Sequence, residues 1–309
     1  MKYKEWLEQW LAVYIKPMSK AKTYDQYSDI AKCHLMPEFG EYELSEIGPL
    51  EVQRYVTRIM ERGNLRTGKG LSANTVNSHI TVIQSSLEMA FVLGLVKDYT
   101  MDKVKRPKPE ERKIYPFTTE EQKTIEKAVM SDKRDKMKGI IICLYTGMRI
   151  GELMALEWED IDFLNMKLTV TKTCHDGNDE NGNYTRITND PKTETSNREI
   201  PIPKQIMPVL KEMKKKSRSK YVISNGDKMI SVRSYQRSFE LLLKKLKLPH
   251  RGFHSLRHTF ATRAISCGMD VKSLSEILGH KSSTVTLKRY VHSFMEVKRD
   301  MMNKIGKLF

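Results

Sequence analysis

Apolar side chains recur every three or four positions through the first hundred residues, which is the spacing that places them on one face of a helix. Four such runs follow one another: Trp6, Leu7, Trp10, Leu11 and Tyr14; Tyr24, Tyr27, Ile30 and Ala31; Val52, Tyr55, Val56 and Ile59; and Val76, Ile80, Ile83, Leu87 and Phe91. The pattern predicts four amphipathic helices that pack into one compact unit.

Residues that start and stop helices stand at the ends of these runs. The expected starts are a capping box at Thr23 and Gln26, Pro49, and Ser72, and the expected stops are Pro37 with Gly40, Gly63, and Gly94. Between Lys97 and Lys113 the apolar periodicity disappears, and two prolines stiffen a basic segment. We therefore expect a helical domain over residues 1–106, a basic linker over 107–112 and a second domain over 113–309.

The second domain mixes helix and strand patterns. A capping box at Thr118 and Glu121 opens it, and an apolar helix through Ile140 and Leu144 should end at Gly147. The strand patterns are 168–174, 184–187 after the turn residues Asn181 and Gly182, 198–202, and a short hairpin around Asn225 and Gly226. Helical patterns dominate from Ile206 onward. The expected fold is mainly α with a small antiparallel β-sheet, an α+β arrangement.

Charge adds a partner class to this picture. The 309 residues carry a formal net charge of +16. Residues 1–110 hold 16 basic and 14 acidic side chains, and residues 111–309 hold 38 and 24, so nearly all the excess lies in the second part. This balance favours a polyanion such as DNA, because each neutralised phosphate releases condensed counterions. RNA, acidic lipid or a generic basic surface stay open on charge alone.

No stretch approaches the roughly 20 consecutive apolar residues that span a bilayer, and the charged start has no signal-peptide core. We therefore expect a cytoplasmic protein with no membrane partner. The cysteines Cys33, Cys143, Cys174 and Cys267 lie far apart and form no CxxC pair. Buried, reduced thiols are favoured over a disulfide framework or a zinc knuckle.

Three short clusters carry side chains suited to phosphoryl transfer. The first is TGMRIGEL, residues 146–153. Gly147 permits a sharp turn, Arg149 follows at a new helix start, and Glu152 lies within reach to orient the guanidinium. A joint between two helices with a surface Arg–Glu pair explains the octapeptide equally well.

The second cluster is HSLRHT, residues 254–259, in which His254 and Arg257 share a helix face. A guanidinium can fork onto two phosphate oxygens while a nearby imidazole moves a proton near neutral pH. His258 is assigned packing or a structural hydrogen bond. The third cluster is LGH, residues 278–280, with Tyr290 ten residues later. By itself it indicates only a helix end and a packed aromatic ring.

Together the clusters resemble the boxes of the tyrosine recombinase, or phage integrase, family over nearly the whole chain. TGMRIGEL is similar to the first arginine box, HSLRHTFAT to the His-x-x-Arg box, and LGH with Tyr290 to the final box. Pro191-Lys192-Thr193 stands where that family has a hairpin lysine. The resemblance implies a core-binding, DNA-binding domain over residues 1–106 and a catalytic domain over residues 113–309.

The resemblance also implies a chemistry. Tyr290 would attack a phosphodiester and leave a 3′-phosphotyrosyl bond. The other implied roles are phosphate binding by Arg149 and Arg257, protonation of the leaving 5′ oxygen by Lys192, acid or base help from His254, donation to the phosphate by His280, and orientation of Arg149 by Glu152. Lys172 rivals Lys192, because the long loop after it leaves the hairpin register open. The interval from His280 to Tyr290 is a residue longer than in many members.

We expect no cofactor, because two arginines and a lysine supply the positive charge that other nucleases take from a metal. His254 and His258 lack the glutamate of HExxH and form a poor zinc pair. Residues 63–70 spell GxxxxGKG, but Gly70 replaces the hydroxyl residue that holds magnesium and a helix precedes the loop. An ATP site is therefore not expected.

The implied function is site-specific DNA recombination, first of all integration and excision of a phage or conjugative element. The expected partners are two specific double-stranded DNA sites, a homotetramer on two duplexes, and accessory DNA-bending or excision factors. An amphipathic tail helix over 293–309 would pack on a neighbouring protomer or on its own domain. Many members carry an additional N-terminal arm-binding domain; since the first helix begins near Met1, we expect that this domain is absent or was removed. A chromosome-dimer-resolving recombinase, a type IB topoisomerase and an inactive DNA-binding regulator remain alternatives.

Overall fold

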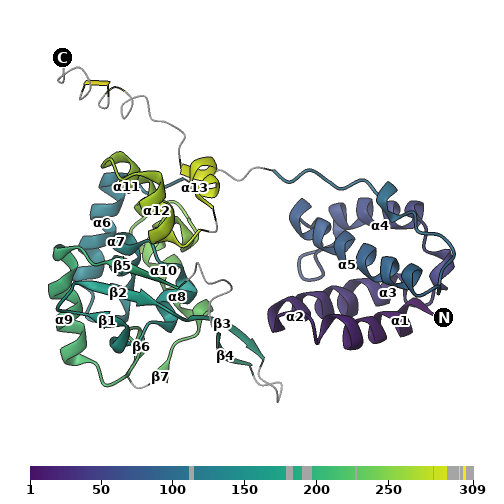
Figure 1. The fold of residues 1–309 in the computed structure, drawn as a ribbon, viewed down its shortest axis with the longest axis horizontal. Helices are drawn as coiled ribbons and strands as arrows, with labels where there is room; N and C mark the ends of the chain where they lie inside the picture. Colours follow the sequence, from purple (N-terminus) through teal and green to yellow (C-terminus); the bar gives the residue numbers. More distant parts are fainter. Residues whose placement is uncertain are drawn as a thin grey trace. The chain divides into compact units, whose positions relative to one another are not determined.

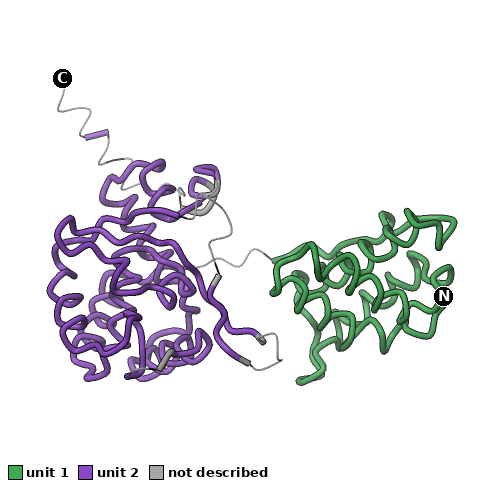
Figure 2. Tube along the Cα trace, turned by 60° about the horizontal axis from the view of Figure 1, so that its bottom comes forward, with its two compact units in different colours: residues 1–112 green, residues 113–309 purple. Residues whose placement is uncertain are grey.

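A computed structural model of the chain describes residues 1–110, 115–178, 184–189, 197–226, 228–280, 282–290, 299 and 302–303. The chain divides into two compact units, residues 1–112 and 113–309, each with its own buried apolar core (Figures 1 and 2). Within the described ranges, no helix combines the length and apolar character needed to cross a membrane.

The first unit is helical. Its helices are α1 (Tyr3–Trp10), α2 (Ala21–Ile30), α3 (Met36–Phe39), α4 (Pro49–Arg62) and α5 (Ala73–Val92). A π-helical turn over Leu11–Ile15 extends α1, and another over Ala31–Leu35 joins α2 to α3. The aromatic side chains of α1 lie in the core, where the Tyr3 hydroxyl is 2.8 Å from Ser86 Oγ and Trp6 Nε1 donates to the Ser86 carbonyl at 2.8 Å. Buried aromatic rings thus keep their polar ends satisfied.

Several predicted helix boundaries are confirmed. Pro49 occupies the first turn of α4, and Gly63 follows its last residue. Ser72 caps α5 by accepting a hydrogen bond from the Thr75 amide at 3.3 Å, and Gly94 follows the helix with a φ of +72°. Ser72 thus supplies the side-chain acceptor that a helix start lacks, and Gly94 supplies a left-handed backbone at a helix end.

The predicted boundaries of α2 are wrong. The amides of Thr23 and Tyr24 both donate to the Lys20 carbonyl, so Thr23 already lies inside the first turn and α2 begins at Ala21. Pro37 does not stop the helical run either, because it occupies the first turn of α3, where a missing amide costs nothing. Gly40 ends the run.

The segment after α5 belongs to the first unit as far as Pro107. Met101 and Val104 are buried in its core. Asn77 Nδ2 donates to the Pro107 carbonyl at 3.0 Å, and Arg106 Nη1 donates to the Asn77 carbonyl at 3.1 Å. These bonds fasten the basic segment along α5.

The second unit mixes helices with small sheets (Figure 1). Its helices are α6 (Thr119–Met130), α7 (Gly139–Thr146), α8 (Ile150–Ala155), α9 (Met207–Lys216), α10 (Val232–Lys245), α11 (His254–Ser266), α12 (Val271–Leu278) and α13 (Ser283–Tyr290). Its strands are β1 (Ile161–Asp162), β2 (Lys167–Val170), β3 (Thr173–Asn178), β4 (Tyr184–Asn189), β5 (Arg198–Pro201), β6 (Ser224–Asn225) and β7 (Lys228–Met229). The Thr118–Glu121 capping box and the hairpin around Gly226 are confirmed.

The single strand predicted over 168–174 is wrong, because two strands cover it. β2 pairs with β1 and β5 in an antiparallel sheet, while β3 pairs only with β4 among the described strands. β5 pairs with β2 as far as Val170, opposite Arg198, and from Thr173 onward the chain pairs with β4 instead. Lys172 therefore lies in the connection and not within a strand.

The four cysteines differ in their exposure. Buried thiols are found for Cys143 and Cys174, whereas Cys33 and Cys267 are exposed, so that expectation is wrong for half of the cysteines. Of the tail helix expected over 293–309, only Arg299, Met302 and Asn303 are among the described residues.

Ser72→Ala should destabilise the first unit by about 1 kcal/mol, because it removes the acceptor that caps α5. Ser72→Thr keeps that acceptor and serves as the control. Urea unfolding of the whole chain, followed by tryptophan fluorescence, measures both, since two of the three tryptophans, Trp6 and Trp10, lie in the first unit. Equal stability of the alanine variant and the wild type would contradict the capping role.

Candidate active site

A glycine turn brings the first cluster to its place. The apolar helix α7 ends at Gly147, which has a φ of +66°. A Cβ there would lie 2.4 Å from Cδ1 of Phe260 on α11, so only glycine fits both the backbone and the neighbouring helix. Arg149 follows as the N-cap of α8.

Glu152 binds Arg149 as the three-residue spacing predicts. Arg149 donates from its amide to Glu152 Oε2 at 2.8 Å and from Nη1 to Glu152 Oε1 at 2.7 Å. The Glu152 carboxylate therefore caps the start of α8 and also orients the Arg149 guanidinium. The Arg149 side chain remains 37% exposed, so one side of it faces solvent.

A second arginine binds the same carboxylate, and the sequence reasoning missed it. Arg198 on β5 donates from Nη2 to Glu152 Oε2 at 2.7 Å and from Nη1 to Oε1 at 3.1 Å. Its Nε donates to the Ile277 carbonyl at 2.6 Å. A signal did exist, because Arg198 shares the buried face of β5 with Ile200, and a cation at a buried position of a strand requires a partner.

The charge state of Glu152 follows from these contacts. Burial raises the pKa of this carboxyl, but the Arg198 hydrogen bonds and the charges of Arg198 and Arg149 outweigh burial and lower the pKa from 4.5 to about 2. Glu152 is therefore a carboxylate at neutral pH. It is also nearly inaccessible, with 4% of its surface exposed.

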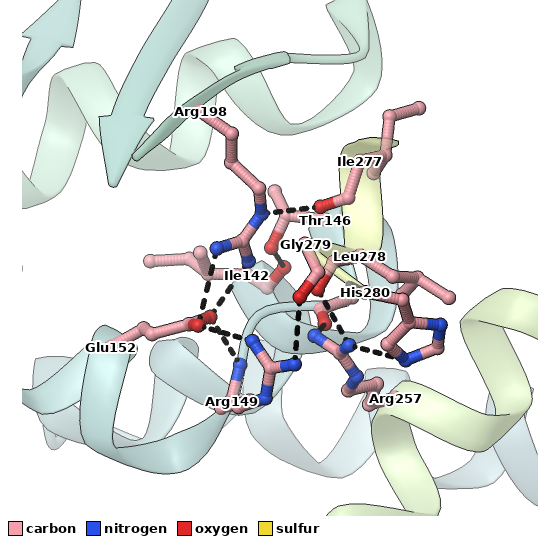
Figure 3. A network of polar contacts seen from close by, with 11 residues as sticks. Ile142, Thr146, Arg149, Glu152, Arg198, Arg257, Ile277, Leu278, Gly279 and His280 are labelled. Atoms are coloured by element: carbon pink, nitrogen blue, oxygen red, sulfur yellow. Dashed lines mark hydrogen bonds and ion pairs between the residues drawn. The ribbon is translucent and has the colours of Figure 1, made fainter. Parts of the chain in front are cut away.

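Arg257 joins the three sequence clusters (Figure 3). Its Nη1 donates to the Gly147 carbonyl at 2.9 Å, and its Nη2 donates to the Leu278 carbonyl at 2.6 Å. Arg149 Nη2 donates to the next carbonyl, that of Gly279, at 3.1 Å. Two guanidiniums from different helices thus converge on the turn that follows α12.

Gly279 makes this convergence possible. Its φ of +63° turns the chain at the end of α12. A Cβ at this position would lie 3.0 Å from Arg198 Nη1 and 3.1 Å from its Cδ. The left-handed backbone and the close approach of Arg198 both require glycine.

The histidines border this cluster. His254 is the exposed first residue of α11, and its ring contacts His258 edge to face with centroids 4.7 Å apart. His280 Nε2 lies 3.0 Å from Arg257 Nη2, and its Nδ1 lies 2.7 Å from Thr286 Oγ1. The sequence reasoning also missed Thr286, which is fully buried on α13.

The remaining predicted site residues are placed only in part. Tyr290 is the last residue of α13, and its side chain is outside the described part. Lys192 lies outside the described residues altogether. Lys172 Nζ is 3.4 Å from Glu157 Oε2 and 3.9 Å from Glu159 Oε1.

The cluster has the chemistry of an anion site. Arg149 and Arg198 bind the Glu152 carboxylate, and Arg257 reaches the same turn after α12. Three guanidiniums and one carboxylate leave two net positive charges next to His280. Guanidiniums fixed in this way suit a phosphate oxygen better than a metal. Among the described residues, no group of three or more histidine, cysteine or acidic side chains is arranged to hold a metal ion.

Comparisons with known proteins identify the family of the chain. A profile of the phage integrase family matches residues 110–296, and a profile of the phage integrase N-terminal SAM-like domain matches residues 2–60. The chain belongs to the phage integrase family. It is accordingly a tyrosine-type recombinase, a DNA strand transferase, and the family membership expected from the three boxes is confirmed.

The relatives in this family include recombinases of several kinds. A tyrosine recombinase XerC-like protein of Caldanaerobacter subterraneus is 28% identical, with 98% of this chain and 82% of the relative covered. The ICEBs1 integrase of Bacillus subtilis is 25% identical, with 94% and 79% covered. The Tn1549 transposon integrase in complex with a circular intermediate DNA has a TM-score of 0.79 at 21% identity, with 99% of both chains covered. The predicted fold class is confirmed.

Glu152→Gln should destabilise the second unit by about 3 kcal/mol at pH 7, because Arg198 would stay buried without its counter-charge. A carboxyl with a lowered pKa stabilises the fold above its ordinary pKa of 4.5, and this contribution disappears as pH falls toward 2. The stability difference from wild type should therefore shrink below pH 4.5. Urea unfolding at several pH values measures it, with the exposed Glu159→Gln as control. A difference that stays constant down to pH 3 would contradict the assignment.

Proposed function

We propose that this chain is the integrase of a mobile element, and that the residues converging on the turn after α12 bind the DNA phosphate that is cut. The observation that carries the proposal is the pair of bonds from Arg257 and Arg149 to the carbonyls of Leu278 and Gly279. It brings three boxes of sequence to one point. The similarity to the ICEBs1 integrase supports a mobile-element role.

In the proposed reaction Tyr290 attacks the phosphorus and releases a 5′ hydroxyl, leaving a 3′-phosphotyrosyl bond. The bond energy is kept for rejoining, so no nucleotide is consumed. Arg149 and Arg257 bind the non-bridging oxygens and stabilise the charge that builds in the transition state. His254 helps as acid or base, His280 donates to the phosphate, and Glu152 positions Arg149.

The leaving oxygen needs a proton, and two lysines compete for that role. Lys192 matches the family pattern by position. Lys172 has support from the fold, because Thr173 and Cys174, the next residues, pack against Gly151 in the first turn of α8. A Cβ at Gly151 would lie 2.7 Å from Thr173 Oγ1. Lys172 therefore directly precedes β3, the strand that contacts α8, and Arg149 is the N-cap of α8.

The proposed partners follow from the reaction. Exchange between two duplexes requires four strand cuts, and one chain has one Tyr290, so four copies would act together on two specific DNA sites. The first unit would serve as the core-binding domain and the second as the catalytic domain. We also propose that accessory DNA-bending or excision factors take part, and that the protein is located in the cytoplasm.

Tyr290→Phe should retain DNA binding and lose strand cleavage. The experiment incubates the protein with nicked duplexes that span the DNA junctions beside its gene, in EDTA, and separates covalent adducts on a denaturing gel. Wild type is expected to form a metal-free adduct that Tyr290→Phe does not form. An adduct with both proteins would show that Tyr290 is not the nucleophile. Tight, salt-sensitive binding without any adduct would favour an inactive regulator.

A bridging-sulfur substrate separates the two lysines. Sulfur is a good leaving group without protonation, so a 5′-bridging phosphorothiolate should restore cleavage to a variant that lacks the general acid. We expect Lys192→Met or Lys172→Met to cut ordinary DNA at least about 100-fold more slowly, with recovery on the sulfur substrate for only one of them. Recovery for neither variant would remove both lysines from the acid role.

A further inference from the structure

The Arg257–His280 contact fixes where the proton of His280 sits. A guanidinium has only N–H donors and stays protonated in proteins. Arg257 Nη2 therefore donates to His280 Nε2 across their 3.0 Å separation, and Nε2 must be an acceptor. The ring proton of neutral His280 is then on Nδ1.

Thr286 receives that proton's hydrogen bond. Its Oγ1 is 2.7 Å from His280 Nδ1, and Thr286 is fully buried. A hydroxyl can accept from an N–H and can also donate to a ring nitrogen. Thr286 can therefore support His280 in either tautomer, a property that an apolar residue of the same shape lacks.

In this tautomer His280 cannot donate a hydrogen bond from Nε2 to a phosphate oxygen, which is its proposed role. With its lone pair facing Arg257, Nε2 has no proton to offer to a phosphate oxygen. A proton must first reach Nε2 from solvent, and Arg257 must release the ring. Through this change Thr286 keeps Nδ1 hydrogen-bonded and the ring in place.

Thr286 also belongs to α13, the helix that ends at Tyr290. Residues four apart on a helix are one turn apart. The Thr286–His280 bond therefore fixes the helix that carries the nucleophile to the turn that gathers Arg149 and Arg257.

We propose that Thr286 is a positioning residue of the recombination site, whose hydroxyl holds Nδ1 of His280 by a hydrogen bond and anchors α13 to the arginine cluster. The proposal rests on the proposed function of His280 and Tyr290. It assigns to Thr286 no contact with the DNA.

The first test reads the tautomer without any activity. The protein is labelled with ¹⁵N-histidine, and its eight histidines are resolved by two-bond ¹H–¹⁵N correlation at neutral pH without DNA, with His280→Gln to assign the signal. Wild type should show His280 with a protonated Nδ1 and an unprotonated Nε2. Thr286→Val should keep this tautomer, because Arg257 still donates to Nε2, but its Nδ1 proton should exchange with water faster because the acceptor is gone. Equal exchange rates in the two proteins would refute the role of Thr286. A wild-type His280 protonated at Nε2 would overturn the proposal.

The second test measures cleavage of nicked duplexes as a function of pH. Thr286→Val keeps the shape of the side chain and should slow adduct formation by about tenfold, the effect of one lost hydrogen bond, with a shifted pH profile and unchanged DNA affinity. Thr286→Ser should restore the rate. Thr284→Val changes an exposed threonine of the same helix and should act like wild type.

The outcomes separate this proposal from the function it rests on. If wild type forms the adduct while Thr286→Val matches its rate and pH profile, the role of Thr286 is refuted and the recombinase function stands. Equal slowing by Thr286→Ser and Thr286→Val would also refute it, because the hydroxyl would then be irrelevant. If wild type forms no adduct, the proposed function fails, and the histidine measurement alone still decides whether Thr286 holds Nδ1 of His280 by a hydrogen bond.

Discussion

The site depends on one buried carboxylate. Removing a charge from water costs several kcal/mol unless strong partners replace the water. At Glu152, guanidinium donors take the place of water on both carboxylate oxygens. One of these comes from its own helix and the other from β5, so α8 and β5 must lie together for the charge to be tolerated. Arg198 in turn donates to the Ile277 carbonyl and thereby includes the end of α12. The contacts that let Glu152 be buried in the second unit therefore also fix the geometry of the site.

Two left-handed glycines direct the backbone toward this cluster. Gly147 and Gly279 each end a helix with φ values of +66° and +63°. Both offer their carbonyls to arginines, Gly147 to Arg257 and Gly279 to Arg149. A Cβ at Gly147 would lie 2.4 Å from Cδ1 of Phe260, and a Cβ at Gly279 would lie 3.0 Å from Arg198 Nη1. In each of these two short motifs the glycine therefore does two things: it ends a helix, and its carbonyl accepts a hydrogen bond from an arginine.

Local features explain what the sequence could predict. Helix ends at Pro49, Ser72 and Gly147 depend on one residue and its nearest amides, and they were predicted correctly. The split between β2 and β3 could not be predicted, because it depends on a change of partner from β5 to β4, and both partners lie later in the chain. Thr286 is the same kind of case, since its partner is defined only when α13 meets α12. Arg198 was within reach, because its position among the inward residues of β5 is a local fact.

In the proposed function, Arg149 and Arg257 bind a phosphate without losing much side-chain entropy when DNA arrives. Arg149 and Arg257 are held by a carboxylate and by backbone carbonyls before any DNA is present, so their rotamers are fixed during folding. Glu152 cancels one of three guanidinium charges and leaves two. A phosphodiester carries one negative charge and gains more as the nucleophile attacks, so a site with two fixed positive charges binds the transition state better than the ground state. Glu152 thereby sets the net charge of the site in addition to its geometry.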